Sequence, residues 1–387
     1  MEQAHQKHAG IQRAAYGTFH RQEWAFIGAP CGSIKKLTCD LAALLRERWK
    51  IAYVDADHQE AGAPARETLL TRGFSLEYTD KIAYHRLDFQ ASLDAYQYRT
   101  LFNDQDLVLV NGNHYTAKRQ IVLIDPRKEA SLQKKLDRLT QVDLLLLTED
   151  HLIPYPFLLD HLSELGQKDV PILSINDTAS IAGFLNQHLE NSLPPLLGLV
   201  LAGGKSVRMG DDKSRIDYHG LPQRDHAARL LQPYCREVYL SVRPDQTGEP
   251  NHSFPLITDT FLGLGPLGAI LSAFREKPDA AWLVIACDLP FLNPDTLELL
   301  LRERNPSLMA TAFNSPVNNL PEPLIAIWEP RSYPILLQFL AQGYDCPRKA
   351  LINSPIHLLE APDPQALENV NTPEEKKSAL EKLKNKE

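Results

Sequence analysis

Short apolar runs alternate along the whole chain with longer segments in which apolar residues recur every three or four positions. The short runs predict strands, and the longer segments, such as residues 37–48 and 132–139, predict amphipathic helices. This alternation is typical of an α/β protein with a mainly parallel sheet. The strands expected in the first half are residues 24–27, 51–54, 107–110, 121–124, 144–147 and 172–175.

A pair of prolines divides this pattern into two series. Residues 191–195 read Asn-Ser-Leu-Pro-Pro, and consecutive prolines suit a short, semi-rigid connector. A second series of strands and helices begins at residue 197. We therefore predict two α/β domains, residues 1–192 and 193–387, as the length of 387 residues also favours. The charged segment 374–387 is interpreted as a solvated last helix.

Composition narrows the possible partners. Apolar residues make up 43% of the chain and charged residues 23%, as in soluble globular proteins, and the net charge of −8 gives no general attraction to nucleic acid or anionic membranes. No apolar run is long enough to span a bilayer, and the first eight residues contain no apolar signal core. The five cysteines form no CxxC pair, which predicts reduced thiols in a cytoplasmic protein. They are Cys31, Cys39, Cys235, Cys287 and Cys346.

The strongest chemical signal is the segment 201–213, which reads LAGGKSVRMGDDK and follows an apolar strand. The paired glycines, Gly203 and Gly204, let the backbone turn tightly and present N–H groups to an anion. Arg208 adds a planar fork for phosphate oxygens, and Lys213 adds a point charge on a flexible stem. We therefore predict a triphosphate site without a Walker A loop. The simpler alternative is a glycine-rich surface turn followed by a solvated basic helix.

A carboxylate, Asp288, follows the apolar strand expected over residues 282–286. Open α/β sheets place their binding sites at the carboxyl ends of strands. Mg²⁺ favours one or two carboxylates together with phosphate oxygens. Asp288 is therefore the candidate magnesium ligand, and the alternative is a helix N-cap before Pro290.

The segment 201–213 resembles the signature LAGGxSxRMGxDK of the molybdenum cofactor guanylyltransferases, within the wider superfamily of nucleotidyltransferases. Four further motifs follow in the order found in that family. They are Asp259 with the GLGPLG of residues 263–268, the ACDLPF of residues 286–291, the PEPL of residues 321–324 and the NVNTPEE of residues 369–375. The resemblance implies a Rossmann-like nucleotidyltransferase fold of the nucleotide-diphospho-sugar transferase type. It also implies transfer of GMP from GTP to the phosphate of molybdenum-molybdopterin, with Mg²⁺ as cofactor and pyrophosphate as the second product.

The same resemblance implies roles for individual residues. Arg208, Lys213 and Asp288 would be catalytic, with Asp288 holding the metal. The nucleotide would be bound by Leu201, Ala202, Gly203, Gly204, Lys213, Ser241, Asp259 and Asp288. The pterin side of the site would be shaped by Gly265, Pro266, Glu322, Asn369 and Asn371. Ser241 departs from the asparagine of the family pattern, and a hydroxyl offers fewer hydrogen-bonding groups than an amide.

The choice of GTP rests on the sequence Leu-Ala-Gly-Gly at residues 201–204, since cytidylyl relatives tend to read AAG. Cytidylyl transfer to the same pterin and nucleotidyl transfer to another phosphorylated acceptor remain as alternatives. A non-catalytic pterin-binding scaffold is the alternative from another functional class. The presence of Lys213 together with Asp288 favours an enzyme. GTP and molybdopterin are the expected substrates, and proteins of molybdenum-cofactor insertion are candidate partners.

The first half carries a weaker motif. Residues 28–38 read GAPCGSIKKLT and stand between an expected strand and a helix, which is the context of a P-loop. However, Ser33, Ile34 and Lys35 replace its second glycine, its lysine and its magnesium-binding hydroxyl residue, and Asn111 takes the later acidic position. Residues 20–190 nevertheless resemble the GTP-binding adaptor protein of molybdopterin-guanine dinucleotide synthesis. We expect a degenerate P-loop-like domain that docks or passes the pterin without hydrolysing GTP. The Asp-Ala-Asp-His of residues 55–58 is interpreted as a strand-end turn.

Overall fold

The computed structural model describes residues 17–56, 69–93, 95–149, 151–204, 212–247 and 253–385. The chain forms two compact units, one of residues 21–191 and one of residues 192–387 together with residues 1–20. Of that first segment, Gly17 donates its backbone N–H to Asp279 Oδ1 at 3.2 Å, and His20 Nδ1 lies 2.8 Å from the carbonyl oxygen of Ser192. No helix in the described part of the chain combines the length and apolarity that crossing a membrane requires.

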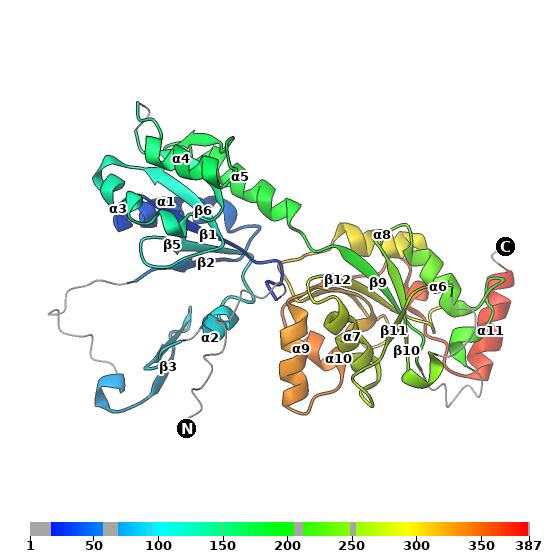
Figure 1. Ribbon diagram of the computed structural model, residues 1–387. Helices are drawn as coiled ribbons and strands as arrows, with labels where there is room; N and C mark the ends of the chain where they lie inside the picture. The colour runs from blue at the N-terminus through cyan, green and yellow to red at the C-terminus, as the bar shows by residue number, and fades with distance from the viewer. Residues whose placement is uncertain are drawn as a thin grey trace, which may run out of the picture. The chain divides into compact units, whose positions relative to one another are not determined.

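The N-terminal unit is built on a six-stranded sheet in the order β2-β5-β1-β6-β7-β8, and all neighbouring strands are parallel (Figure 1). Its strands are β1 (Gln22–Ile27), β2 (Ile51–Val54), β5 (Leu107–Asn111), β6 (Arg119–Ile124), β7 (Val142–Leu147) and β8 (Ile172–Ser174). The six strands expected from the apolar runs of this half are therefore confirmed. Because the central parallel strands are covered on both faces, their inner residues, such as 24–27, 107–110 and 121–124, are continuously apolar and do not alternate.

Helices cover both faces of this sheet. The helices α1 (Cys31–Leu45) and α5 (Thr178–Asn191) share one apolar core, and α3 (Glu129–Gln133) and α4 (Pro156–Glu164) share the opposite one. A third cluster includes Tyr98 of α2 (Ala95–Thr100). The helix expected over residues 132–139 is wrong in extent, because α3 ends at Gln133 and a 3₁₀ turn follows at Leu136–Arg138. A hairpin of β3 (Leu76–Asp80) and β4 (His85–Phe89), which the sequence pattern had not indicated, forms a separate antiparallel pair.

The C-terminal unit contains a seven-stranded sheet in the order β11-β10-β9-β12-β14-β13-β15. The four strands β11, β10, β9 and β12 are parallel, and so are β13 and β15, whereas β14 runs antiparallel to both of its neighbours. The strands are β9 (Leu196–Leu201), β10 (Val238–Val242), β11 (Leu256–Thr258), β12 (Ala281–Ala286), β13 (Ala310–Asn314), β14 (Pro321–Trp328) and β15 (Ile356–Leu359). This sheet is therefore mixed.

Two apolar cores lie on the two faces of this sheet. One includes residues of α6 (Gln223–Leu231) and α8 (Pro294–Arg302), and the other includes residues of α7 (Gly265–Glu276), α9 (Ser332–Ala341) and α10 (Pro347–Ile352). The last helix, α11 (Pro373–Lys384), packs through Ala379 in a smaller cluster with Ile216, Phe291 and Val370. The remaining 3₁₀ turns of the chain are Leu69–Arg72, Pro126–Lys128, Lys213–Arg215, Pro244–Gln246 and Pro364–Leu367.

Candidate active site

A pocket of about 1020 Å³ opens at the carboxyl ends of the parallel strands in the C-terminal unit. Starting from β9, the strands β10 and then β11 lie on one side of it. The next parallel strand in the chain, β12, lies on the other side of β9. In open α/β sheets, ligands bind where the strand order reverses in this way. The pocket lies at this reversal, because residues at the ends of both β9 and β12 line it.

Most of the residues that the sequence singled out line this one pocket. They are Leu201, Ala202, Gly203, Gly204, Lys213, Ser241, Asp259, Gly265, Pro266, Asp288 and Asn371. The pocket also contains residues to which the sequence gave no role. Five of them lie in the motifs quoted above, namely Asp212, Gly263, Ala286, Cys287 and Leu324, and the others are Ser214, Arg243, Pro244, Asp245, Phe261, Leu262 and Ala269. Arg208 lies outside the described residues.

The glycine turn after β9 packs closely against the end of β10. A Cβ atom on Gly203 would lie 3.3 Å from the backbone nitrogen of Arg243 and 3.5 Å from Oδ2 of Asp259. The N–H of Ala202 donates to the carbonyl oxygen of Ser241 at 3.0 Å. A side chain at position 203 would therefore crowd the neighbouring loop, which accounts for the glycine there.

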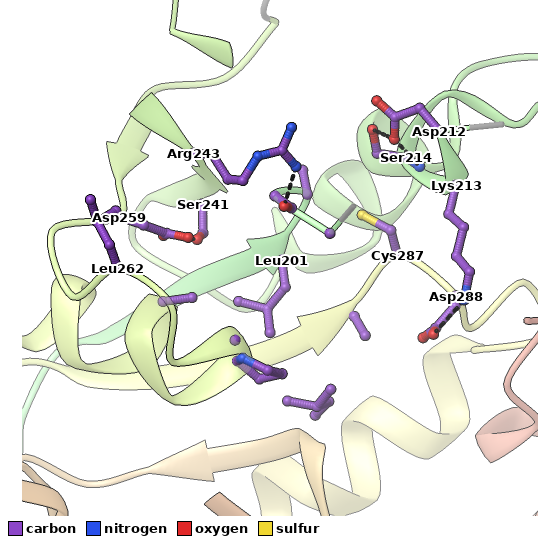
Figure 2. A pocket seen from close by; sticks show the side chains of 18 of the residues that line it. Leu201, Asp212, Lys213, Ser214, Ser241, Arg243, Asp259, Leu262, Cys287 and Asp288 are labelled. Atoms are coloured by element: carbon purple, nitrogen blue, oxygen red, sulfur yellow. Dashed lines mark hydrogen bonds and ion pairs between the residues drawn. The ribbon is translucent and has the colours of Figure 1, made fainter. Parts of the chain in front are cut away.

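Arg243 is the main residue that the sequence reasoning missed. Its Nη1 donates to the carbonyl oxygen of Gly203 at 2.6 Å (Figure 2). Its Nε and Nη2 each donate to Asp245 at 3.0 Å. A guanidinium group held on two sides by hydrogen bonds is fixed in place. Its position two residues after Ser241 was the available signal, since alternate residues at a strand end share a side.

Ser241, which is buried, and Asp259, which is partly buried, form a pair on the same side of the pocket. The Ser241 hydroxyl, only 1% exposed, donates to Asp259 Oδ1 at 2.6 Å. Burial raises the pKa of Asp259, and the hydrogen bond from Ser241 and the charge of Arg243 act in the opposite direction. The proton of the Ser241 hydroxyl is thus already used in a hydrogen bond to Asp259.

Lys213, Asp288 and Asn371 meet on the other side of the pocket. Lys213 Nζ lies 3.4 Å from Asp288 Oδ2 (Figure 2). The same Nζ donates to Asn371 Oδ1 at 2.5 Å. The Oδ1 atom of Asp288 is buried and has no hydrogen-bond partner among the described residues. Burial raises the pKa of Asp288, and the positive charge of Lys213 offsets part of this effect. A buried carboxylate oxygen without a partner is a natural ligand for a cation.

Local capping motifs hold Lys213 and Asn371 in place. Asp212 caps the 3₁₀ turn Lys213–Arg215 by accepting hydrogen bonds from the backbone N–H and the hydroxyl of Ser214. At the start of α11, Thr372 and Glu375 form a capping box, and Glu375 Oε2 also accepts the N–H of Asn371 at 2.6 Å. The motif NTPEE therefore forms the start of α11 and positions Asn371 next to Lys213.

Two residues expected on the pterin side do not line the pocket. Glu322 forms an ion pair with Arg348, whose Nη2 lies 2.8 Å from Glu322 Oε2, so its carboxylate is engaged by α10. Asn369 is exposed two residues before Asn371. From the same β14 strand, Leu324 lines the pocket instead. The described residues contain no group of three or more potential metal ligands.

Comparison with known proteins gives a consistent result for this half of the chain. Residues 198–355 match the model of a family described as the MobA-like NTP transferase domain. A molybdenum cofactor guanylyltransferase of Pseudomonas putida is 31% identical over 193 residues, which cover 48% of this chain and 98% of that protein. A molybdenum cofactor biosynthesis bifunctional protein of Synechocystis is 36% identical over 185 residues, and the chain spans 53% of its length.

A solved structure gives a weaker match over a similar length. The molybdopterin-guanine dinucleotide biosynthesis protein A of Archaeoglobus fulgidus is 22% identical, with a TM-score of 0.43. The match covers 49% of this chain and 99% of that one.

Proposed function

The chain belongs to the molybdenum cofactor guanylyltransferase family, and from this membership and the geometry of the pocket we propose that it transfers GMP from GTP to the phosphate of molybdenum-molybdopterin. In this reaction a phosphate oxygen of the pterin attacks the α-phosphorus of GTP, and the bond to the β-phosphate breaks to release pyrophosphate. The observation that carries the proposal is the convergence of the glycine turn, Lys213 and Asp288 on one pocket. The order β11-β10-β9-β12 supports a Rossmann-like fold, since it corresponds to the 3-2-1-4 strand order of such domains.

Catalysis of this transfer depends mainly on positioning and on neutralising charge. We assign the backbone of residues 201–204 to binding the nucleotide, with Lys213 and Arg208 neutralising phosphate charge. Ser241 and Asp259 form a second nucleotide contact, supported by Arg243. We assign Gly265, Pro266 and Asn371 to the part of the pocket that binds the pterin acceptor.

The residues present fit a bound Mg²⁺. Asp288 offers a buried carboxylate oxygen that lacks a hydrogen-bond partner among the described residues, and Mg²⁺ needs only one or two carboxylates when substrate phosphates and water complete its shell. When bound, the metal would neutralise negative charge on the phosphates. Lys213 would then share its charge between the phosphates and Asp288.

For the N-terminal unit we propose a degenerate adaptor-like domain without GTP hydrolysis. The side chain of Ile34 is fully buried in the core at the position where a P-loop has its lysine. Asn111 is also fully buried and donates its amide to Asp55 Oδ1 at 2.8 Å. An apolar residue and an amide at these two positions leave phosphate and magnesium without their usual ligands. We propose docking or transfer of the pterin as its role, with proteins of molybdenum-cofactor insertion as partners.

A cytoplasmic location is part of the same proposal. All five cysteines are free thiols, which is the usual state in a reducing compartment.

A pyrophosphate-release assay on the full chain tests the transferase proposal, with molybdopterin as acceptor and GTP or CTP as donor. We expect release with GTP, and the molybdopterin-guanine dinucleotide should be identified by mass spectrometry. Faster release with CTP would make the protein a cytidylyltransferase. No release with either nucleotide would favour the non-catalytic scaffold. GTP hydrolysis by the Asp288→Asn variant would contradict the role given to the N-terminal unit.

A further inference from the structure

A second cluster of reactive side chains lies in the N-terminal unit. Cys31 is the first residue of α1, and its Sγ lies 3.2 Å from Nε2 of His114. The same Nε2 lies 3.9 Å from Oδ1 of Asp55, which follows β2. Asn113 also donates its side-chain amide to the sulfur at 3.5 Å. A thiol, an imidazole and a carboxylate thus meet where β1, β2 and β5 end.

The backbone around this cluster is tightly built. Gly28 has φ +101°, and a Cβ atom there would lie 2.3 Å from the carbonyl oxygen of Leu123. A Cβ atom on Gly112 would lie 2.8 Å from the Cβ of Ile27. Both turns therefore require glycine, and they fix the residues that follow, Cys31 and His114, against each other.

Asp55 is itself oriented by hydrogen bonds. Tyr53 donates its hydroxyl to Oδ2 at 2.7 Å, and Asn111 donates its amide to Oδ1 at 2.8 Å. Burial alone would raise the pKa of Asp55. The hydrogen bonds and the charge of His114 lower it, and their combined effect is the larger one. An ionised carboxylate close to an imidazole stabilises its protonated form.

Two basic side chains lie beside the cluster. Lys135 Nζ and Arg138 Nη1 both donate to the carbonyl oxygen of Asn113, at 3.1 and 3.3 Å. Burial lowers the pKa of Lys135, as does the neighbouring Arg138, while Cys31 favours its charged form. The N-terminus of α1, a helix of 15 residues, adds a partial positive charge. Positive charge near the cluster attracts an anionic reagent.

We propose that Cys31 is a nucleophilic thiol, with His114 as its general base, that forms a mixed disulfide with a small anionic disulfide such as glutathione disulfide. His114 Nε2 takes the proton from Sγ as the sulfur attacks one sulfur of the reagent. The reagent's S–S bond breaks, and its second sulfur leaves and takes up the proton from His114. The products are the Cys31 mixed disulfide and one free thiol, so that atoms and electrons balance.

The chain provides a matched control for this reaction. Cys39 lies two turns further along α1 and is exposed, whereas Cys31 is half-buried. No hydrogen-bond partner of the Cys39 thiol is found in the described part of the chain. If exposure alone governed reactivity, Cys39 would react first. If the cluster governs it, Cys31 would react first.

The experiment treats the full-length protein with glutathione disulfide and follows each cysteine by peptide mass spectrometry over time. We expect Cys31 to react roughly tenfold faster than Cys39. The variant His114→Gln should slow Cys31 by roughly tenfold or more and leave Cys39 unchanged. Asp55→Asn should slow Cys31 by a smaller factor, and it provides a second test if His114→Gln does not fold. Equal rates at the two cysteines, or a Cys31 rate that neither substitution changes, would overturn the proposal.

Discussion

The Nζ atom of Lys213 lies 3.4 Å from Oδ2 of Asp288, although 75 residues separate the two in the chain. The same Nζ also reaches Asn371, which stands just before the last helix. One cation therefore connects the loop after β9, the end of β12 and the start of α11. Because the three parts come from distant segments, the contact depends on the complete fold of the unit, and its members can be tested separately.

Replacing Asp288 by asparagine should separate catalysis from folding. We expect the transfer rate to fall by at least about 100-fold, because the charge proposed to hold the metal is lost. Thermal stability should stay equal or rise, since burial disfavours the charged carboxylate and an amide avoids that cost. Pyrophosphate release and thermal unfolding measure the two effects. Asp295→Asn, at an exposed position of α8, is the control. Near-normal activity at saturating Mg²⁺ would exclude Asp288 as the metal ligand.

Lys213→Met should slow transfer by about 100-fold to 1000-fold, because a charge that stabilises the leaving pyrophosphate is removed. Lys213→Arg should restore part of the rate, since it keeps the charge but changes its geometry. The matched control is Lys277→Met, because Lys277 is exposed after α7. Steady-state kinetics with GTP measures these rates. A rate unchanged in Lys213→Met would place this lysine outside the catalytic machinery.

Arg243→Gln should weaken nucleotide binding more than the chemical step. The substitution removes the hydrogen bond to the carbonyl oxygen of Gly203 and loosens the glycine turn. We expect KM for the nucleotide to rise roughly tenfold, which corresponds to the ~1.4 kcal/mol of one hydrogen bond to a charged group, while kcat changes little. Arg236→Gln, at an exposed position before β10, should leave both constants unchanged. A fall in kcat alone would instead indicate that Arg243 acts in the transition state.

His226 should make the C-terminal unit sensitive to acid. Burial and then the neighbouring His219, whose ring stacks at 3.8 Å between centroids, lower the pKa of His226 from 6.5 to about 4. Between pH 6.5 and 4 the histidine is protonated in the unfolded chain but not in the folded one. Its contribution to the free energy of unfolding is therefore fully present above pH 6.5 and is lost as the pH falls toward 4. We expect a loss of about 1 kcal/mol after allowance for solvent screening. Denaturant unfolding of His226→Gln at pH 7.5 and 5 should show a smaller loss than the wild type.

Local sequence patterns predicted the elements better than the way they pair. The six expected strands of the first half are found because each is a short, mostly apolar run, and the central ones are covered on both faces. The helix expected over residues 37–48 corresponds to α1, which begins earlier, at Cys31, directly after Pro30, and ends earlier, at Leu45. The direction of β14 was not predictable, since antiparallel pairing with β12 and β13 depends on contacts between distant segments.

The candidate site was predictable only where the side chains have a distinctive chemistry. Paired glycines followed by an arginine and a lysine, together with a carboxylate at a strand end, indicate phosphate and metal chemistry as a combination. Arg243 was missed because an arginine in a polar loop is usually solvated. Its spacing from Ser241 was a weak signal, and its contact with Gly203 is seen only in the fold. Glu322 was expected to support the pterin or the metal, yet Arg348 from α10 engages it, a partner that only the fold reveals.

The capping box of α11 has a consequence for anyone who engineers this protein. The final helix resembles a dispensable tail in its composition, but its first turn determines where the Asn371 amide stands. Trimming the helix, or fusing a bulky tag that unwinds it, would release that amide and leave Lys213 with a different set of neighbours. Changes made in α11 would then alter the enzyme kinetics in the same way as substitutions inside the pocket.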